Sequence, residues 1–138
     1  MEQKNPKLNN VMQTIEDALQ KEQGVLFCYL FGSFARGNAI PKSDVDVALY
    51  LSGEKQQDFF QMRLSLIEKL TRALGKEVDV VVLNTAFPFL KYAVLKEGIL
   101  VFERDPRTRI EFELRALNEY FDYKPILELY RTRLRTPA

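Results

Sequence analysis

The stretch Val25-Leu-Phe-Cys-Tyr-Leu-Phe31, followed at once by Gly32-Ser33, decides the fold of this 138-residue chain. The near-continuous apolar run is too short for a buried helix and is rich in strand formers, so it predicts a strand that is buried on both faces. The glycine and serine behind it indicate a tight turn. We therefore place residues 25–31 in the centre of a sheet.

Three further strands are predicted downstream. A loop of Gly, Asn, Pro and Lys between Arg36 and Ser43 leads into Asp44-Val-Asp-Val-Ala-Leu-Tyr-Leu51, which is predicted to be the second strand. β-Branched and apolar residues predict the third strand at 78–83 and the fourth at 99–102.

Apolar residues at helical spacing predict helices between these strands. The first helix covers about 7–23 and is closed by Gly24, and a short helix begins near Pro88, is capped by Asn84-Thr85 and ends at Gly98. The helix between the second and third strands is followed by Gly75 as a C′ residue. Its predicted core stripe consists of Phe59, Phe60, Leu64, Ile67, Leu70 and Leu74.

A helical region is predicted at about 105–135. Asp105 and Pro106 are suited to the N-cap and the first helical position, and Pro125 is expected to kink or split the helix. The predicted apolar stripe of this region consists of Ile110, Leu114, Leu117 and Phe121.

The chain shows no internal repeat and no interdomain linker. We therefore predict a single α+β domain, residues 1–138, with a small mixed sheet and flanking helices. Its motif core covers about 25–83. A 46% share of hydrophobic residues supplies enough material for a core without disulfides or a structural metal.

Charge and composition exclude several functions. The 20 Lys plus Arg and 19 Asp plus Glu leave a formal charge of +1, which gives no global field for nucleic acids or membranes. The chain has no histidine, so Ser-His-Asp catalysis and His-ligated zinc are excluded, and carboxylates must carry any chemistry.

Cellular location is predicted from the N-terminus and the single cysteine. Residues 1–10 lack the apolar stretch of a signal peptide, and no apolar run approaches the length of a membrane span. Cys28 lies in an apolar run, which fits a core position in a reducing compartment. We expect a cytoplasmic protein with no membrane contact.

Three carboxylates are the candidate catalytic and metal-binding residues. Asp44 and Asp46 lie two positions apart and project from one face of the predicted second strand. Asp79 joins them if the second and third strands are neighbours, with Glu77 as the weaker candidate on that strand. Like charges raise each other's pKa, so such a cluster needs a positive partner.

A divalent cation is the natural partner, because no Lys or Arg lies within these strands. Mg²⁺ prefers carboxylate oxygens together with substrate phosphates, and two such ions suit an in-line phosphoryl or nucleotidyl displacement. Gly32 permits close backbone approach, and Ser33 adds a hydroxyl and an amide where a phosphate would be stabilised. Arg36 lies close enough in sequence to reach the same phosphates, although a surface role is equally compatible.

Gly32-Ser33, a spacer, Asp44-Val-Asp46 and a later strand carboxylate at Asp79 resemble the signature of the DNA polymerase beta-like nucleotidyltransferase superfamily. More narrowly, Gly32-Ser-Phe-Ala-Arg-Gly37 followed by Ser43-Asp-Val-Asp46 is similar to minimal nucleotidyltransferases. In particular, it resembles the MntA antitoxins that partner HEPN-domain toxins. The matching stretch covers about 25–83.

The resemblance implies Mg²⁺-dependent transfer of AMP from ATP to a hydroxyl, in the antitoxin family a tyrosine of the HEPN RNase toxin. It implies that Asp44 and Asp46 ligate the metals, and that Asp79 completes a metal site and helps to deprotonate the acceptor. Gly32 and Ser33 would hold the triphosphate. Ser43 belongs to the nucleotide-binding set by its motif position. The expected partners are therefore ATP and a HEPN-domain toxin from a neighbouring gene.

Other functions remain open at this point. The chain is alternatively a non-catalytic antitoxin or scaffold that binds a partner, or a small-molecule nucleotidyltransferase of the aminoglycoside type, against which the lack of an acceptor-binding domain argues. Arg131, Arg133 and Arg135 are more simply explained as solvated cations near a helix C-terminus than as a nucleic-acid contact, so no direct nucleic-acid binding is expected. Both homo- and hetero-oligomers are compatible with the sequence.

Overall fold

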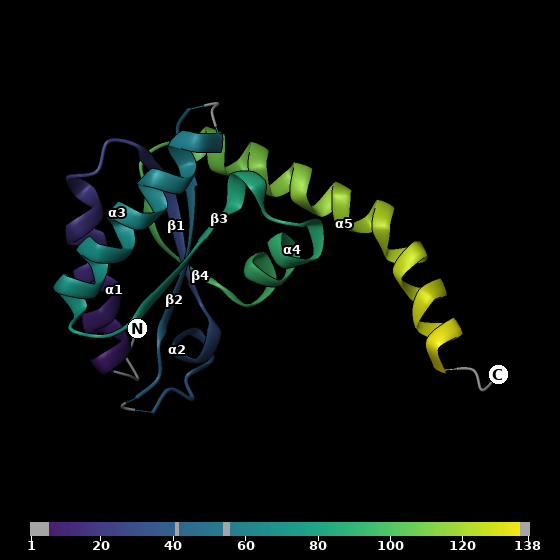
Figure 1. Cartoon of the computed structure of the whole chain (residues 1–138), viewed down its shortest axis with the longest axis horizontal. Coiled ribbons are helices and arrows are strands. Elements are labelled where there is room, and N and C mark those ends of the chain that lie inside the picture. The colour runs from purple at the N-terminus through teal and green to yellow at the C-terminus, as the bar shows by residue number, and fades with distance from the viewer. Residues whose placement is uncertain (1–5, 41, 54–55, 136–138) are drawn as a thin grey trace.

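The computed structural model of the chain describes residues 6–40, 42–53 and 56–135 (Figure 1). The elements, in chain order, are α1 (Pro6–Gln20), β1 (Val25–Phe31), α2 (Gly32–Arg36), β2 (Val45–Leu51), α3 (Gln56–Leu74), β3 (Val78–Val82), the 3₁₀ turn η1 (Leu83–Thr85), α4 (Pro88–Glu97), β4 (Ile99–Glu103) and α5 (Pro106–Arg135). Among these described residues, no helix is both long enough and apolar enough to cross a membrane.

The four strands form one mixed sheet in the order β3-β2-β1-β4. β1 is antiparallel to β2 and to β4, whereas β2 and β3 are parallel. The predicted α+β class and the central position of 25–31 are therefore confirmed. The second strand begins at Val45 rather than Asp44, so Asp44 lies in the loop directly before it.

Helices cover both faces of the sheet. Figure 1 shows α1 and α3 on one side and α4 and α5 on the other. Alternate side chains of each strand enter the two layers. Val45, Val47 and Leu49 pack with Ile15 and Leu70 of the α1 and α3 layer. The opposite layer contains Phe27, Tyr29, Ala48, Phe112 and Ala116.

The predicted stripe of α3 is wrong at two positions. Phe59 and Leu70 are buried, as is Leu66, whereas Phe60 is 59% exposed and Leu64 is 49% exposed. Each residue turns about 100° around a helix, so positions 59, 66 and 70 share one line while 60 and 64 lie well to one side of it.

The predicted stripe of α5 is wrong at three of its four positions, and the fourth, Leu117, is half-buried. Phe112 and Ala116 are buried, while Ile110, Leu114 and Phe121 are exposed. At about 100° per residue, Ile110, Leu114 and Phe121 lie on the side of the helix opposite Phe112. The helix also extends beyond the sheet (Figure 1). α5 is not split at Pro125, although its last, yellow part runs in a different direction from its green part (Figure 1).

One predicted helix cap is confirmed, whereas two other predicted helix ends differ from the structure. Asp105 caps α5 as expected, because its Oδ1 accepts from the Thr108 backbone N–H at 3.3 Å. Asn84 caps no helix. Its side chain instead bonds both backbone groups of Leu51 at 2.8 Å, which ties η1 to the end of β2. α1 ends at Gln20, earlier than the Gly24 boundary.

Candidate active site

Asp46 and Asp79 are register partners on the parallel strands β2 and β3. Cross-strand partners present their side chains on the same face of a sheet, here the face covered by α4 and α5. Asp44 precedes β2 by one residue and is exposed. The sheet thus brings Asp46 and Asp79 together as the sequence predicts, with Asp44 at the rim.

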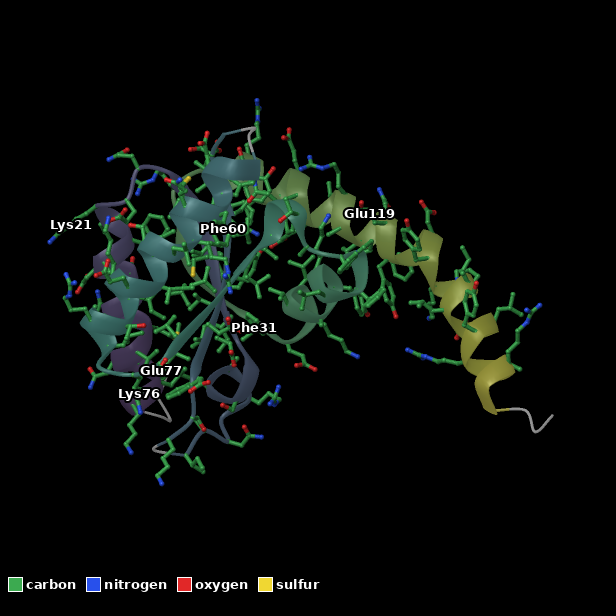
Figure 2. All side chains as sticks on the ribbon, in the orientation of Figure 1. Lys21, Phe31, Phe60, Lys76, Glu77 and Glu119 are labelled. Carbon is green, nitrogen blue, oxygen red and sulfur yellow. The ribbon has the colours of Figure 1, made fainter. Side chains whose placement is uncertain are left out.

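α2 begins where β1 ends, beside the start of β2. Phe31, the last residue of β1, pairs with Asp46, and Figure 2 shows Phe31 next to α2. The backbone of Gly32 has φ +76°, and a Cβ atom placed there would lie 2.2 Å from Oδ2 of Asp46. Only glycine therefore lets the Asp46 carboxylate lie against the first residue of α2.

The electrostatics of the site centre on Asp46. Burial raises the pKa of its carboxyl above the usual value, the negative charges of Asp79 and Asp44 raise the pKa further, and Arg36 acts in the opposite direction. Asp79 and Asp44 are thus close enough to repel the carboxylate of Asp46. This repulsion means that a bound positive charge would stabilise the cluster.

The donor set of the cluster consists of carboxylate oxygens, which is the ligand chemistry that Mg²⁺ prefers. Yet within the described residues no group of three acidic, histidine or cysteine side chains is drawn close enough to hold a metal ion. The expected convergence of three carboxylates is therefore partial: the acids share one neighbourhood, but their side chains are not gathered around one point.

Arg63 of α3 is a site residue that the sequence reasoning missed. Its Nη2 lies 3.6 Å from Oδ1 of Asp79, whose side chain is 59% exposed. Its Nε also donates to the backbone oxygen of Val80 at 2.7 Å. The strands themselves contain no Lys or Arg, but this cation reaches Asp79 from the neighbouring helix, and no local motif signals the contact.

The remaining predicted residues lie around this centre. Ser33 is half-buried in α2. Arg36, at the end of α2, forms an ion pair with Glu97 of α4 at 3.6 Å, and both side chains are 50% exposed. Ser43 Oγ accepts from the Ile40 N–H at 2.9 Å and so closes the loop before Asp44.

Glu77 lies outside the cluster. It precedes β3, and its backbone oxygen accepts from the Val45 N–H at 2.9 Å. Figure 2 shows Glu77 near the lower ends of α1 and α3, whereas Phe31 lies beside α2. Asp79 is therefore the better third carboxylate.

A mixed sheet that holds neighbouring-strand carboxylates against a glycine-serine helix is the arrangement expected of a nucleotidyltransferase. The chain belongs to the polymerase beta nucleotidyltransferase family, whose model matches residues 13–107. The predicted enzyme class and superfamily are confirmed.

Two curated relatives lie within this family. A candidate protein adenylyltransferase of Methanocaldococcus jannaschii is 33% identical over 93 residues, which cover 67% of this chain and 95% of the relative. The protein adenylyltransferase MntA of Shewanella oneidensis is 33% identical over 90 residues, covering 65% of this chain and 60% of MntA.

Solved structures share the fold. A toxin–antitoxin crystal structure with AMP-PNP superposes with a TM-score of 0.77 at 22% identity, over 91% of this chain and 98% of the other. An MNT antitoxin structure in complex with a tri-AMPylated HEPN toxin of Shewanella oneidensis gives a TM-score of 0.67 at 20% identity, over 94% and 97% of the two chains.

Proposed function

We propose that this protein transfers AMP from ATP to a hydroxyl group, a tyrosine of a cognate HEPN-domain RNase toxin, and thereby acts as its antitoxin. The observation that carries the proposal is the placement of the Asp46 carboxylate between the backbone of Gly32 and its register partner Asp79. The adenylyltransferase relatives and the AMPylated HEPN complex of a structural neighbour support the choice of AMP and of the partner.

Asp44, Asp46 and Asp79 would hold Mg²⁺, two ions in all. When bound, the metal neutralises the carboxylates and the phosphates and polarises the α-phosphate. Gly32 and Ser33 offer backbone amides to the triphosphate, and Ser43 holds the loop that delivers Asp44. Arg36 contacts the phosphates once it leaves Glu97, because an exposed ion pair at 3.6 Å costs little to break.

In the transfer step, the acceptor oxygen attacks the α-phosphorus of ATP. The new O–P bond forms as the bond between the α-phosphorus and the bridging oxygen breaks, so pyrophosphate leaves with that electron pair. Asp79 takes the proton of the acceptor hydroxyl. Its position suits this role, because its carboxylate is more exposed than that of Asp46 and so is open to a second substrate.

A binding-only antitoxin is the second candidate function. It is favoured by exposed apolar residues on the projecting part of α5, where Phe121, Ile126 and Tyr130 are 57%, 51% and 60% exposed. Such a surface fits a protein partner. It is compatible with catalysis, because a protein substrate must also be bound.

Labelled ATP separates the two functions. The purified protein is incubated with Mg²⁺, the product of the neighbouring gene as the proposed HEPN-domain partner, and ATP labelled at either the α- or the γ-phosphate. We expect label on the toxin from the α position alone, and none with Asp46→Asn. Label from the γ position would indicate a kinase. Co-purification of the two proteins without transfer of label would favour the binding-only function.

A further inference from the structure

The outer edge of β3 has no strand beside it in the described part of the chain, because β3 is the terminal strand of the sheet. Successive residues of a strand direct their backbone groups to opposite sides. The Glu77 oxygen accepts from Val45 of β2, so Val78, Val80 and Val82 direct their N–H and C=O groups to the outer edge. The bond from Arg63 to the Val80 oxygen confirms this direction.

A hollow of about 500 Å³ runs along this edge, between α3 and β3. Phenylalanine and valine side chains from α3 and β3 contribute to its walls, together with polar groups. Among them is Phe60, which is 59% exposed and labelled on α3 in Figure 2. The described residues that line it are Phe59, Phe60, Arg63, Val80, Val81, Val82 and Thr85. The hollow adjoins the active site, since Asp79 directly precedes Val80 and contacts Arg63, and both Val80 and Arg63 line the hollow.

We propose that this edge is the acceptor subsite: an extended polypeptide segment of the protein substrate pairs with β3 as a fifth strand and presents its hydroxyl side chain beside Asp79. The proposal rests on the proposed function and adds how its second substrate is held. A strand paired at the edge lies about 4.8 Å from β3, and its residue opposite Asp79 has its side chain on the face of the carboxylates.

The chemistry of the edge selects a polypeptide over other acceptors. Outward backbone groups offer main-chain hydrogen bonds, and the Phe and Val walls accept alternate apolar side chains. An RNA or aminoglycoside acceptor would need acidic or basic groups along the hollow, and among the described residues that line it Arg63 alone carries a charge. Arg63 donates a hydrogen bond to the Val80 backbone oxygen and so covers the edge when no strand is bound. A backbone N–H of the incoming strand replaces this hydrogen bond.

Two measurements on the full chain test the subsite, both with the proposed HEPN-domain partner. The first is the steady-state kinetics of AMP transfer for Phe60→Ser and for Leu64→Ser, a control on the same helix that is 49% exposed and lies outside the hollow. We expect Phe60→Ser to raise the KM for the toxin about tenfold, with kcat and the KM for ATP close to wild type. Leu64→Ser should leave the KM for the toxin, kcat and the KM for ATP close to wild type. Thermal melting of both variants verifies folding.

The second measurement is backbone hydrogen exchange of β3 with and without the toxin. We expect the Val80 and Val82 amides to exchange at least about tenfold more slowly in the complex. Labelled toxin with unprotected amides and an unchanged KM in Phe60→Ser would overturn the subsite and leave the proposed function intact. Protected amides without any AMP transfer would uphold the subsite and overturn the chemistry. Neither protection nor transfer would overturn both.

Discussion

A Cβ atom at Gly32 would lie 2.2 Å from Oδ2 of Asp46. The first residue of α2 and the central carboxylate of β2 are thus fitted to each other, and the fit requires the absence of a side chain. The glycine of the Gly-Ser pair therefore has a role in positioning the site as well as in the turn.

Alanine at Gly32 should displace Asp46 and reduce AMP transfer more than about 100-fold. Gly37→Ala is the matched control, because Gly37 has φ +78° but nothing within 4 Å of an added Cβ. Both variants should lose about 1 kcal/mol of the free energy of unfolding from the left-handed backbone. Transfer kinetics and urea unfolding measure the two effects. Equal activity of the two variants would contradict the fit.

Asp46→Asn should abolish transfer and leave the melting temperature at pH 7 unchanged or higher, measured in EDTA. The pKa of folded Asp46 lies above its unfolded value, so folding favours the protonated carboxyl and the ionised form is destabilising. This penalty is present at pH 7 and disappears as the pH falls below the unfolded pKa of about 4. The advantage of the variant should shrink over that range.

Asp58→Asn serves as the charge control for this prediction. Asp58 lies in the first turn of α3, where a negative charge stabilises the helix, so its removal should lower the melting temperature slightly. If Asp46→Asn melted several degrees below wild type, Asp46 would be a structural acid rather than a catalytic one.

Substitutions of Arg36 and of Glu97 should have different effects on the KM for ATP. If Arg36 leaves Glu97 to contact the triphosphate, Arg36→Ala raises the KM for ATP several-fold, while Glu97→Gln lowers it or leaves it unchanged. Stability should change by less than about 0.5 kcal/mol in both, because the pair is half exposed. An equal rise of KM in the two variants would show that the pair itself, and not Arg36 with ATP, matters.

Tyr29→Phe should destabilise the protein by about 1–2 kcal/mol without altering the KM for ATP. The buried Tyr29 hydroxyl donates to Glu113 of α5, and burial together with that bond raises the pKa of the phenol. Glu113 also pairs with Arg109, so the bond joins β1 to an ion-paired segment of α5. Urea unfolding measures the loss, with the exposed Tyr130→Phe as control. Equal stability of the two variants would contradict this role of Tyr29.

The sequence predicts the strands better than the faces of the helices. Residues 25–31 form β1 as predicted because a short, wholly apolar run has few other solutions. The sequence predicts Ile110 and Leu114 in the core, yet both are exposed. They lie on the side of α5 opposite Phe112, and apolar periodicity cannot tell a core face from a partner surface.

The site was predictable to the extent that it is local. Asp44-Val-Asp46 and Gly32-Ser33 are visible as short motifs, and register then sets Asp79 opposite Asp46. Arg63 was not predictable, because its contact with Asp79 arises from the packing of α3 on β3 and leaves no mark in the spacing of residues. The position of β3 at the edge of the sheet was not predictable either, because strand order depends on long-range packing.

The most direct test of the central claim is the intact mass of the toxin after co-expression. The HEPN-domain protein is isolated from cells that also produce either the wild-type chain or Asp46→Asn, and its mass and modified residue are determined. We predict covalent AMP on a tyrosine with wild type and an unmodified toxin with the variant. An unmodified toxin in both, or equal modification in both, would contradict nucleotidyl transfer by the carboxylates of β2 and β3.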